Sequence, residues 1–216
     1  MGLKAAALHF VVISTLSLGA LSASAQTREV QLVGFGDSLM AGYQLPANEA
    51  YTAQLEAALK AKGTSVTIAN AGVSGDTTSG ALARIDWSVP DGTDGVILEF
   101  GANDALRGIS PEQSEKNLDA MVARLKERGI KVVLAGMLAP PNMGGNYAER
   151  FNPIYKTLSE KYDVPLYPFF LDGVAAQQSL QLADGMHPNA QGVGVMVERS
   201  LPVMQDFVQS ILMEEK

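Results

Sequence analysis

The sequence predicts an α/β fold in which helices cover both faces of a parallel β-sheet. Five short runs of apolar and β-branched residues alternate along the chain with longer segments whose apolar residues recur at helical spacing. The runs are nearly continuous in apolar residues, as is typical of strands that are buried on both faces. Regular alternation of strands and helices favours parallel pairing through crossover helices.

The expected strands are short and apolar. The first ends in Gly36, which permits a sharp turn, and the third is as uniformly apolar as a central strand should be. Active and ligand-binding sites in such sheets form outside the carboxyl ends of the strands, so the polar, glycine-containing segments that follow strands are the candidates for a site. We expect strands over residues 30–35, 65–69, 95–100, 131–135 and 164–168.

The expected helices have recognisable ends. Ser110 can cap a helix, Pro111 suits the first helical position, and Glu112 places an acid in the first turn. Pro153 is compatible with a helix only near its start or at a kink, and Pro202 predicts a bend in the last helix. We expect helices over residues 49–62, 110–128, 147–162 and 189–212.

The composition describes one acidic globular domain. The chain has 216 residues, of which 47% are apolar, and no repeat, linker or low-complexity segment divides it. The net charge is −7 and no Lys/Arg cluster stands out, so we expect neither a nucleic-acid partner nor an anionic membrane surface. The absence of cysteine excludes disulfides, thiolate metal ligands and a cysteine nucleophile.

The first residues have the pattern of a secretory signal peptide. Lys4 precedes a mostly apolar stretch over residues 5–21, and Ala-Ser-Ala at residues 23–25 forms a small-x-small cleavage site. The alternative is an anchor that is never cut, but the apolar stretch is short for a membrane span. We expect residues 1–25 to be a signal peptide, residues 26–216 to be one domain, and the mature protein to be periplasmic or secreted, without stable membrane insertion.

A serine, a histidine and an aspartate offer the most economical acid–base chemistry. Removal of the leader would remove His9 and leave His187 as the one histidine, three residues after Asp184. Asp184 can fix the tautomer of His187, which can activate Ser38 at the end of the first strand. Taken alone, Ser38 could equally sit in a helix cap, and the Asp–His pair could lie in an ordinary surface loop.

Two further segments could stabilise a developing oxyanion. Gly75 can present a bare backbone N–H, and Asn103 can offer a side-chain N–H. Each also has a structural explanation as a turn or cap. One site explains all these segments more simply than independent structural roles do. Metal-ligand spacing and phosphate-binding glycine motifs are missing, so we expect no metal and no cofactor.

In this order, the segments resemble the sequence blocks of the SGNH/GDSL hydrolase superfamily. The resemblance covers essentially the whole mature chain and places the superfamily's four named residues on Ser38, Gly75, Asn103 and His187, with the catalytic acid on Asp184. The chain is most similar to the bacterial periplasmic branch described as thioesterase I, lysophospholipase or arylesterase. The supporting stretches are residues 36–43, 101–108 and 184–189.

The resemblance implies a three-layer α/β/α, flavodoxin-like fold with a five-stranded parallel sheet. It also implies an esterase or thioesterase that forms an acyl-enzyme on Ser38, works without a metal, holds the oxyanion with Ser38, Gly75 and Asn103, and acts on a small acyl ester or thioester. We expect a monomer, although no sequence feature specifies the oligomeric state. Met40 and Ala105 depart from the small serine and the glycine that many relatives carry, and could alter chain-length preference.

The substrate is less constrained than the chemistry. The apolar, glycine-rich loop over residues 138–147 resembles the substrate-side loop of the thioesterase branch. We expect this loop, through Pro141, Asn142 and Tyr147, to contact an acyl chain together with Leu39. The loop could also be an ordinary surface connection. A carbohydrate O-acetyl esterase remains the alternative, although one tryptophan and 6% aromatic residues offer few sugar-stacking platforms. A non-catalytic binding module would require a broken triad.

Overall fold

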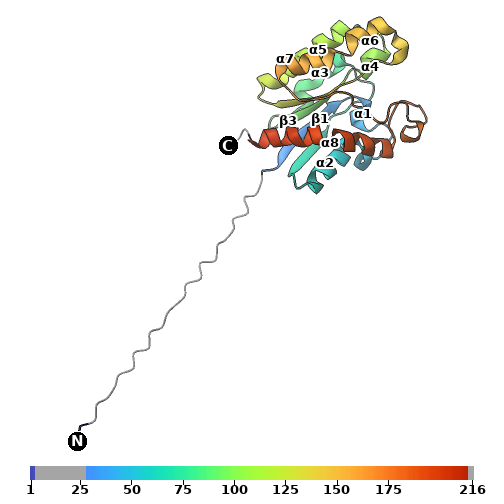
Figure 1. Cartoon of the computed structure of the whole chain (residues 1–216). Helices are drawn as coiled ribbons and strands as arrows, with labels where there is room; N and C mark the ends of the chain where they lie inside the picture. Colours follow the sequence, from blue (N-terminus) through green and yellow to red (C-terminus); the bar gives the residue numbers. More distant parts are fainter. Residues whose placement is uncertain (3–27, 214–216) are drawn as a thin grey trace.

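The computed structural model describes residues 1–2 and 28–213 and contains a five-stranded parallel sheet in the order β2-β1-β3-β4-β5. All four strand pairs are parallel, which confirms the sheet predicted from the alternating pattern. Helices lie on both sides of the sheet (Figure 1). The strands are β1 (Val30–Gly36), β2 (Val66–Asn70), β3 (Gly95–Glu99), β4 (Lys131–Ala135) and β5 (Leu166–Tyr167).

The helices form two layers. One layer contains α2 and α8, which pack together, and the other contains α3, α5 and α7 (Figure 1). The predicted three-layer α/β/α architecture is therefore confirmed. The α-helices are α1 (Ser38–Ala41), α2 (Tyr51–Ala61), α3 (Thr78–Ser88), α4 (Ala102–Leu106), α5 (Pro111–Glu127), α6 (Gly145–Phe151), α7 (Ile154–Tyr162) and α8 (Ala190–Met213), and short 3₁₀ turns span Ala47–Glu49, Pro141–Met143 and Gln178–Leu180.

The order of the strands places the carboxyl ends of β1 and β3 side by side. The chain first crosses from β1 to β2 on one side and then returns to β3 on the other, so β1 and β3 flank the switch point at which open parallel sheets bind ligands. In the register of this pair, Gly36 lies opposite Glu99. The segments after these strands therefore begin at neighbouring positions.

The core occupies both faces of the sheet, as the continuous apolar runs predict. All five residues of β3 are buried. The rings of Phe35 and Phe100 meet edge-on with centroids 4.9 Å apart, and those of Tyr51 and Phe170 do so at 4.7 Å. The first of these contacts lies at the carboxyl ends of β1 and β3, because Phe35 precedes the last residue of β1 and Phe100 directly follows β3.

Several helices differ from the expected ranges. The helix expected over residues 147–162 is divided at Pro153 into α6 and α7, because proline cannot donate the hydrogen bond that would continue α6. Pro202 lies inside α8, which is one continuous helix, and the expected bend there stays a prediction. Helix α3 was not predicted, since its polar first turn resembles a loop, but Thr77 caps it by accepting from the Gly80 N–H.

The predicted signal peptide lies almost entirely outside the described residues, and the structure does not bear on it. Within residues 28–213, no helix is both long and apolar enough to cross a lipid bilayer.

Candidate active site

Ser38 lies at a sharp turn between β1 and α1. A Cβ atom on Gly36 would lie 2.6 Å from both the Met40 Cβ and the Glu99 Oε2, so only glycine fits there. Asp37 then caps α1, because its Oδ1 accepts from the Leu39 N–H at 3.0 Å. Ser38 is 9% exposed and is the first helical residue. The turn thus presents the Ser38 hydroxyl at the carboxyl end of the sheet.

Ser38, His187 and Asp184 form a hydrogen-bonded chain. The Ser38 Oγ lies 2.9 Å from the His187 Nε2, and the His187 Nδ1 lies 2.6 Å from the Asp184 Oδ2. The three residues come from two distant parts of the sequence, and the structure brings them together as the sequence predicts. The Tyr43 ring packs against the imidazole with centroids 4.4 Å apart.

Asp184 is held in place by its own turn. Its Oδ1 accepts from the backbone N–H groups of Met186 at 2.9 Å and His187 at 3.0 Å, while its Oδ2 faces the imidazole. The pKa of Asp184 is lowered to about 2. The largest cause is the hydrogen bond from the His187 backbone, and the His187 side chain contributes as well. Asp184 is therefore a carboxylate at neutral pH and can stabilise a positively charged imidazolium.

Asn103 reaches the site from α4, directly after β3. Gly101 precedes this helix with a φ of +119°, and a Cβ atom there would collide with the Tyr155 hydroxyl. The Asn103 Nδ2 donates to the Asp37 Oδ2 at 3.0 Å, which ties the third-strand segment to the nucleophile turn. An amide nitrogen carries two N–H groups, so one remains for another acceptor.

Gly75 lies in a loop that packs beside the Ser38 turn. The Val73 N–H donates to the Gly36 carbonyl at 3.0 Å, which fixes this loop at the end of β1. Gly75 has a φ of +81°, and its carbonyl accepts from Arg107 at 2.7 Å. Arg107 follows α4, so the second and third predicted segments are joined here as well.

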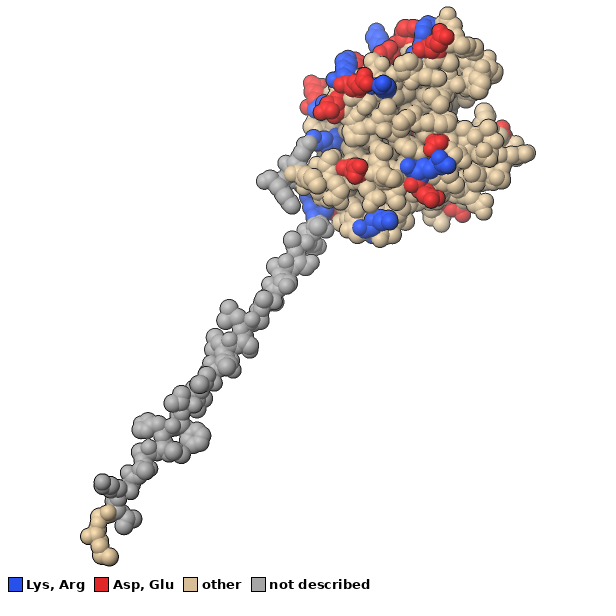
Figure 2. All heavy atoms as spheres, viewed as in Figure 1, with Lys and Arg blue, Asp and Glu red and all other residues tan. Residues whose placement is uncertain are grey.

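A cavity of about 520 Å³ opens beside Ser38 and is lined mainly by apolar side chains. Of the predicted site residues, Ser38, Leu39, Asn103, Pro141 and His187 line it. Figure 2 shows a hollow with few charged atoms between the edge that carries α6 and the segment that precedes α8. The cavity lining matches this position, because it combines residues that follow β4 with residues from 169–187.

Two predicted substrate contacts lie elsewhere. Asn142 and Tyr147 are not among the residues that line the cavity, and the Tyr147 hydroxyl donates to the Ile109 carbonyl at 2.7 Å. The Tyr147 ring stacks on Phe151. Their contact with an acyl chain stays a prediction.

Much of the cavity wall could not be found from the sequence. The segment between β5 and α8 has little regular structure, so no periodicity marks its inward-facing residues. The exposed side chains of Leu106, Leu138 and Met186 also belong to the wall. Leu138, Ala139 and Pro140 belong to the loop predicted from the sequence, whereas the unpredicted lining residues are Ala102, Leu106, Met137, Phe169, Leu171, Ala175, Ala176, Gln181, Gly185 and Met186.

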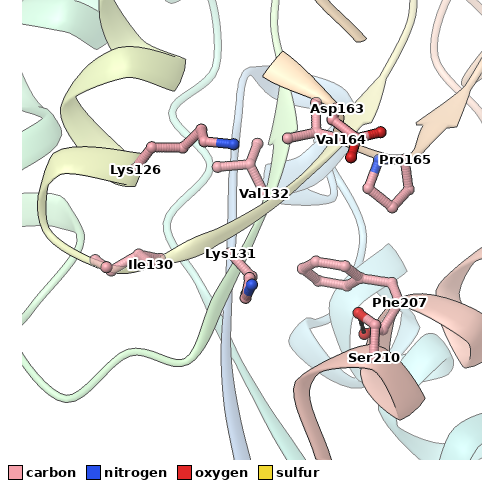
Figure 3. Close-up of a pocket in the computed structure, with 10 residues that line it drawn as sticks. Lys126, Ile130, Lys131, Val132, Asp163, Val164, Pro165, Phe207 and Ser210 are labelled. Carbon is pink, nitrogen blue, oxygen red and sulfur yellow. Dashed lines mark hydrogen bonds between the residues drawn. The ribbon is translucent and has the colours of Figure 1, made fainter. Parts of the chain in front are cut away.

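A second hollow, of about 540 Å³, lies at the opposite end of the sheet (Figure 3). Phe207 and Ser210 of α8 lie on one side of it, and Lys126 of α5 lies on the other. The serine and the lysines in its lining have no histidine beside them. Within the described residues, no group of three or more histidine, cysteine and acidic side chains could hold a metal ion.

Residues 35–195 match the model of the GDSL-like lipase/acylhydrolase family. The chain belongs to this family. The match spans the turn that carries Ser38, the Asn103 segment and the Asp184–His187 turn, so all parts of the hydrogen-bonded chain fall inside it.

Relatives within the family are esterases. The chain is 40% identical over 181 residues to an arylesterase of Vibrio mimicus, an alignment that covers 83% of this chain and 90% of the relative. It is 35% identical over 187 residues to esterase TesA of Pseudomonas aeruginosa, with coverage of 86% and 91%. The crystal structure of the SGNH-hydrolase family esterase AlinE4 superposes with a TM-score of 0.71 at 43% identity, covering 83% of this chain and 96% of that one.

Family membership and these relatives together support a serine esterase, that is, a carboxylic ester hydrolase. This agrees with the activity expected from the sequence.

Proposed function

We propose that Ser38 is the nucleophile, His187 the general base and Asp184 the residue that orients and stabilises His187. The Ser38 hydroxyl attacks the acyl carbonyl while the His187 Nε2 takes its proton. The protonated imidazole then donates that proton to the leaving alcohol or thiol. In the second half of the reaction, water attacks the acyl-enzyme and loses a proton to His187. The bond between the acyl group and the Ser38 Oγ then breaks, His187 returns the proton to Ser38, and the carboxylic acid leaves.

The oxyanion is proposed to bind between three donors. The backbone N–H of Ser38 stands at the start of α1, where helical geometry leaves it without an intrahelical partner. The Gly75 N–H and the second N–H of Asn103 complete the set. Such donors matter because they meet charge that develops only in the transition state, and removal of one costs roughly 10²–10³ in kcat.

The observation that carries this proposal is the chain from Ser38 through His187 to Asp184, with links of 2.9 and 2.6 Å, beside a mainly apolar cavity. The test is covalent labelling with a p-nitrophenyl alkylphosphonate. We expect one adduct per chain on the peptide that contains Ser38, and none in Ser38→Ala. Labelling of another residue, or equal labelling of Ser38→Ala, would reject Ser38 as nucleophile.

The apolar wall of the cavity favours an acyl chain as the group that binds there. Leu39, Leu138, Phe169 and Leu171 offer contacts to methylene groups, each worth about 0.8 kcal/mol when buried. We therefore propose fatty acyl esters or thioesters as substrates in preference to acetylated polysaccharide. Two relatives, the arylesterase of Vibrio mimicus and a thioesterase 1/protease 1/lysophospholipase L1 of Escherichia coli, have names that are compatible with this class.

We also propose that the protein acts outside the cytoplasm, in the periplasm or the medium. The support is the sequence pattern alone: one positive charge, a short apolar stretch and a small-x-small site that ends at Ala25.

A further inference from the structure

Two carboxyl groups lie buried beneath the nucleophile turn, and the proposed reaction does not use either of them directly. Asp37 and Glu99 are both 0% exposed. Glu99 ends β3 opposite Gly36, the residue that precedes Asp37, so the fold places the two acids side by side at the switch point. Burial of an ionised carboxyl group destabilises the fold unless hydrogen bonds or a bound proton compensate, so the contacts of this pair are informative.

Asp37 holds two different parts of the site at once. Its Oδ1 accepts from the Leu39 N–H and its Oδ2 from the Asn103 Nδ2, each at 3.0 Å. Because the Asn103 amide is planar, this bond fixes the direction of its second N–H. Asp37 therefore determines where Asn103 can donate.

Glu99 in turn holds Asp37. The Glu99 Oε2 accepts from the Asp37 backbone N–H at 3.1 Å. The buried Glu99 Oε1 has no hydrogen-bond partner among the described residues. A proton on Glu99 would turn this acid into a donor toward the neighbouring Asp37 carboxylate, whereas two buried carboxylates would repel each other.

The electrostatic surroundings favour a neutral Glu99. Burial and the Asp37 charge raise the pKa of Glu99 well above its usual value, while burial raises the pKa of Asp37 to about 6. Of the two acids, Glu99 is therefore the one that more readily keeps its proton. Of the other charged or titratable groups nearby, the Arg84 guanidinium donates to the Gly36 carbonyl and Asp76, Tyr155 donates to the Phe100 carbonyl, and His187 faces Asp37 from the nucleophile side.

We propose that Glu99 is a positioning residue for ester hydrolysis: it holds Asp37, and Asp37 aims the Asn103 amide at the oxyanion. The inference rests on the proposed roles of Ser38 and Asn103. It assigns Glu99 no contact with substrate. Its effect is transmitted through two hydrogen bonds and is felt when negative charge develops on the carbonyl oxygen.

The first test compares Glu99→Gln with Glu99→Met. Glutamine keeps an oxygen that can accept from the Asp37 N–H, so we expect kcat within about threefold of wild type. Methionine has a similar length but cannot accept this bond, and we expect kcat to fall about 10- to 100-fold with KM changed less than about threefold. Equal losses in the two variants, or a loss confined to KM, would overturn the proposal.

The decisive test is a double-mutant cycle with Asn103→Ala. If Glu99 acts through Asn103, Glu99→Met should lower kcat by no more than about twofold further once the Asn103 amide is gone. A general structural role would instead give losses that multiply. Thermal unfolding identifies the variants that fold, and Glu99→Ala replaces Glu99→Met if the latter does not.

Ser38→Ala separates failure of this inference from failure of the proposed function. Activity that survives in Ser38→Ala would reject the mechanism itself. Serine-dependent activity with multiplying effects of Glu99→Met and Asn103→Ala would reject only the positioning role.

Discussion

The His187 imidazole is constrained on three sides. Asp184 binds the Nδ1, the Ser38 hydroxyl meets the Nε2, and the Tyr43 ring covers part of the imidazole face. The Asp184 carboxylate is itself fixed by two backbone N–H groups of the same turn. The imidazole is therefore presented to Ser38 in one orientation before any substrate arrives, which would lower the reorganisation needed if His187 acts as the proposed base.

Asp184→Asn should test that arrangement. The asparagine amide has almost the same shape but can present an N–H to the imidazole, which favours the wrong tautomer and cannot stabilise the imidazolium. We expect kcat to fall by roughly 10²- to 10⁴-fold with little change in KM. Asp163→Asn, in the lining of the opposite hollow, is the matched control and should retain wild-type kcat. A loss of less than about fivefold in Asp184→Asn would contradict the assigned role.

Asp37 should make stability depend on pH in a recognisable way. Its pKa is raised by burial from 3.8 to about 6, so the folded state binds more protons than the unfolded state between these values. This group therefore destabilises the fold above about pH 6, and the penalty is relieved as pH falls toward 4. Asp37→Asn removes the buried charge.

We accordingly expect Asp37→Asn to gain unfolding free energy relative to wild type at pH 8 and to lose that advantage by pH 4, while kcat falls because Asn103 loses its acceptor. Urea unfolding at pH 4, 6 and 8 measures the first effect and ester hydrolysis the second. A difference in unfolding free energy that does not vary with pH would show that Asp37 carries no buried-charge penalty.

The sequence could identify the reactive residues because their signals are local. The Asp184–His187 spacing fits one tight turn, and Ser38 and Asn103 each follow an apolar strand. It could not reveal that Asp37 binds Asn103, which lies 66 positions away, or that Glu99 holds Asp37. Those bonds depend on the β1–β3 register, and register is a tertiary property.

At the scale of elements, the cavity beside Ser38 is built from connections around the ends of strands. The loop after β4 forms one wall, and the irregular segment between β5 and α8 forms the other. Such residues follow neither the strand nor the helix periodicity of apolar residues, so Phe169 and Leu171 could not be predicted. Leu39 and Pro141 were predicted because their segments resemble those of a known family. Loops of this kind set substrate preference because a rigid sheet supports them.

Ala175→Leu should shorten the preferred acyl chain. Ala175 is half-buried in the cavity wall, and three added carbon atoms would occupy space that a long chain needs. We expect kcat/KM for decanoyl or longer esters to fall about tenfold relative to acetyl ester. Ser210→Leu, in the opposite hollow, should leave the ratio unchanged. An unchanged ratio in Ala175→Leu would mean that the acyl chain does not reach this part of the cavity.

Helix boundaries were predictable where capping chemistry was explicit. Ser110, Pro111 and Glu112 predicted the start of α5, and the Ser110 hydroxyl accepts from the Gln113 N–H at 3.3 Å. Pro153 was correctly seen as a difficulty for one long helix, but its outcome, two helices, depended on tertiary packing.

Across the whole molecule, the carboxyl end of the sheet carries the candidate site and few charged side chains. The carboxyl end gathers the segments that carry Ser38, Asn103 and His187, as the strand order 2-1-3-4-5 requires. In the view of Figure 2, charged side chains lie over both helix layers, and few lie in the hollow between α6 and the segment before α8. An apolar substrate would therefore meet an entrance with little charge.

The proposed leader makes a prediction about the mature chain. Expressed from its full sequence in a Gram-negative host, the protein should appear in the periplasm or medium, with a mass that corresponds to residues 26–216. Intact mass spectrometry of each cell fraction checks this. Recovery of the uncut chain from the membrane fraction would favour the anchor over the signal peptide.

The most direct test of the central claim is hydrolysis of p-nitrophenyl esters from acetyl to palmitoyl by the purified mature protein, with Ser38→Ala measured in parallel. We expect hydrolysis that depends on Ser38 and is fastest for medium or long acyl chains. Turnover of the acetyl ester alone would contradict the acyl-chain cavity and favour a carbohydrate O-acetyl esterase, and equal rates in wild type and Ser38→Ala would contradict the serine mechanism itself.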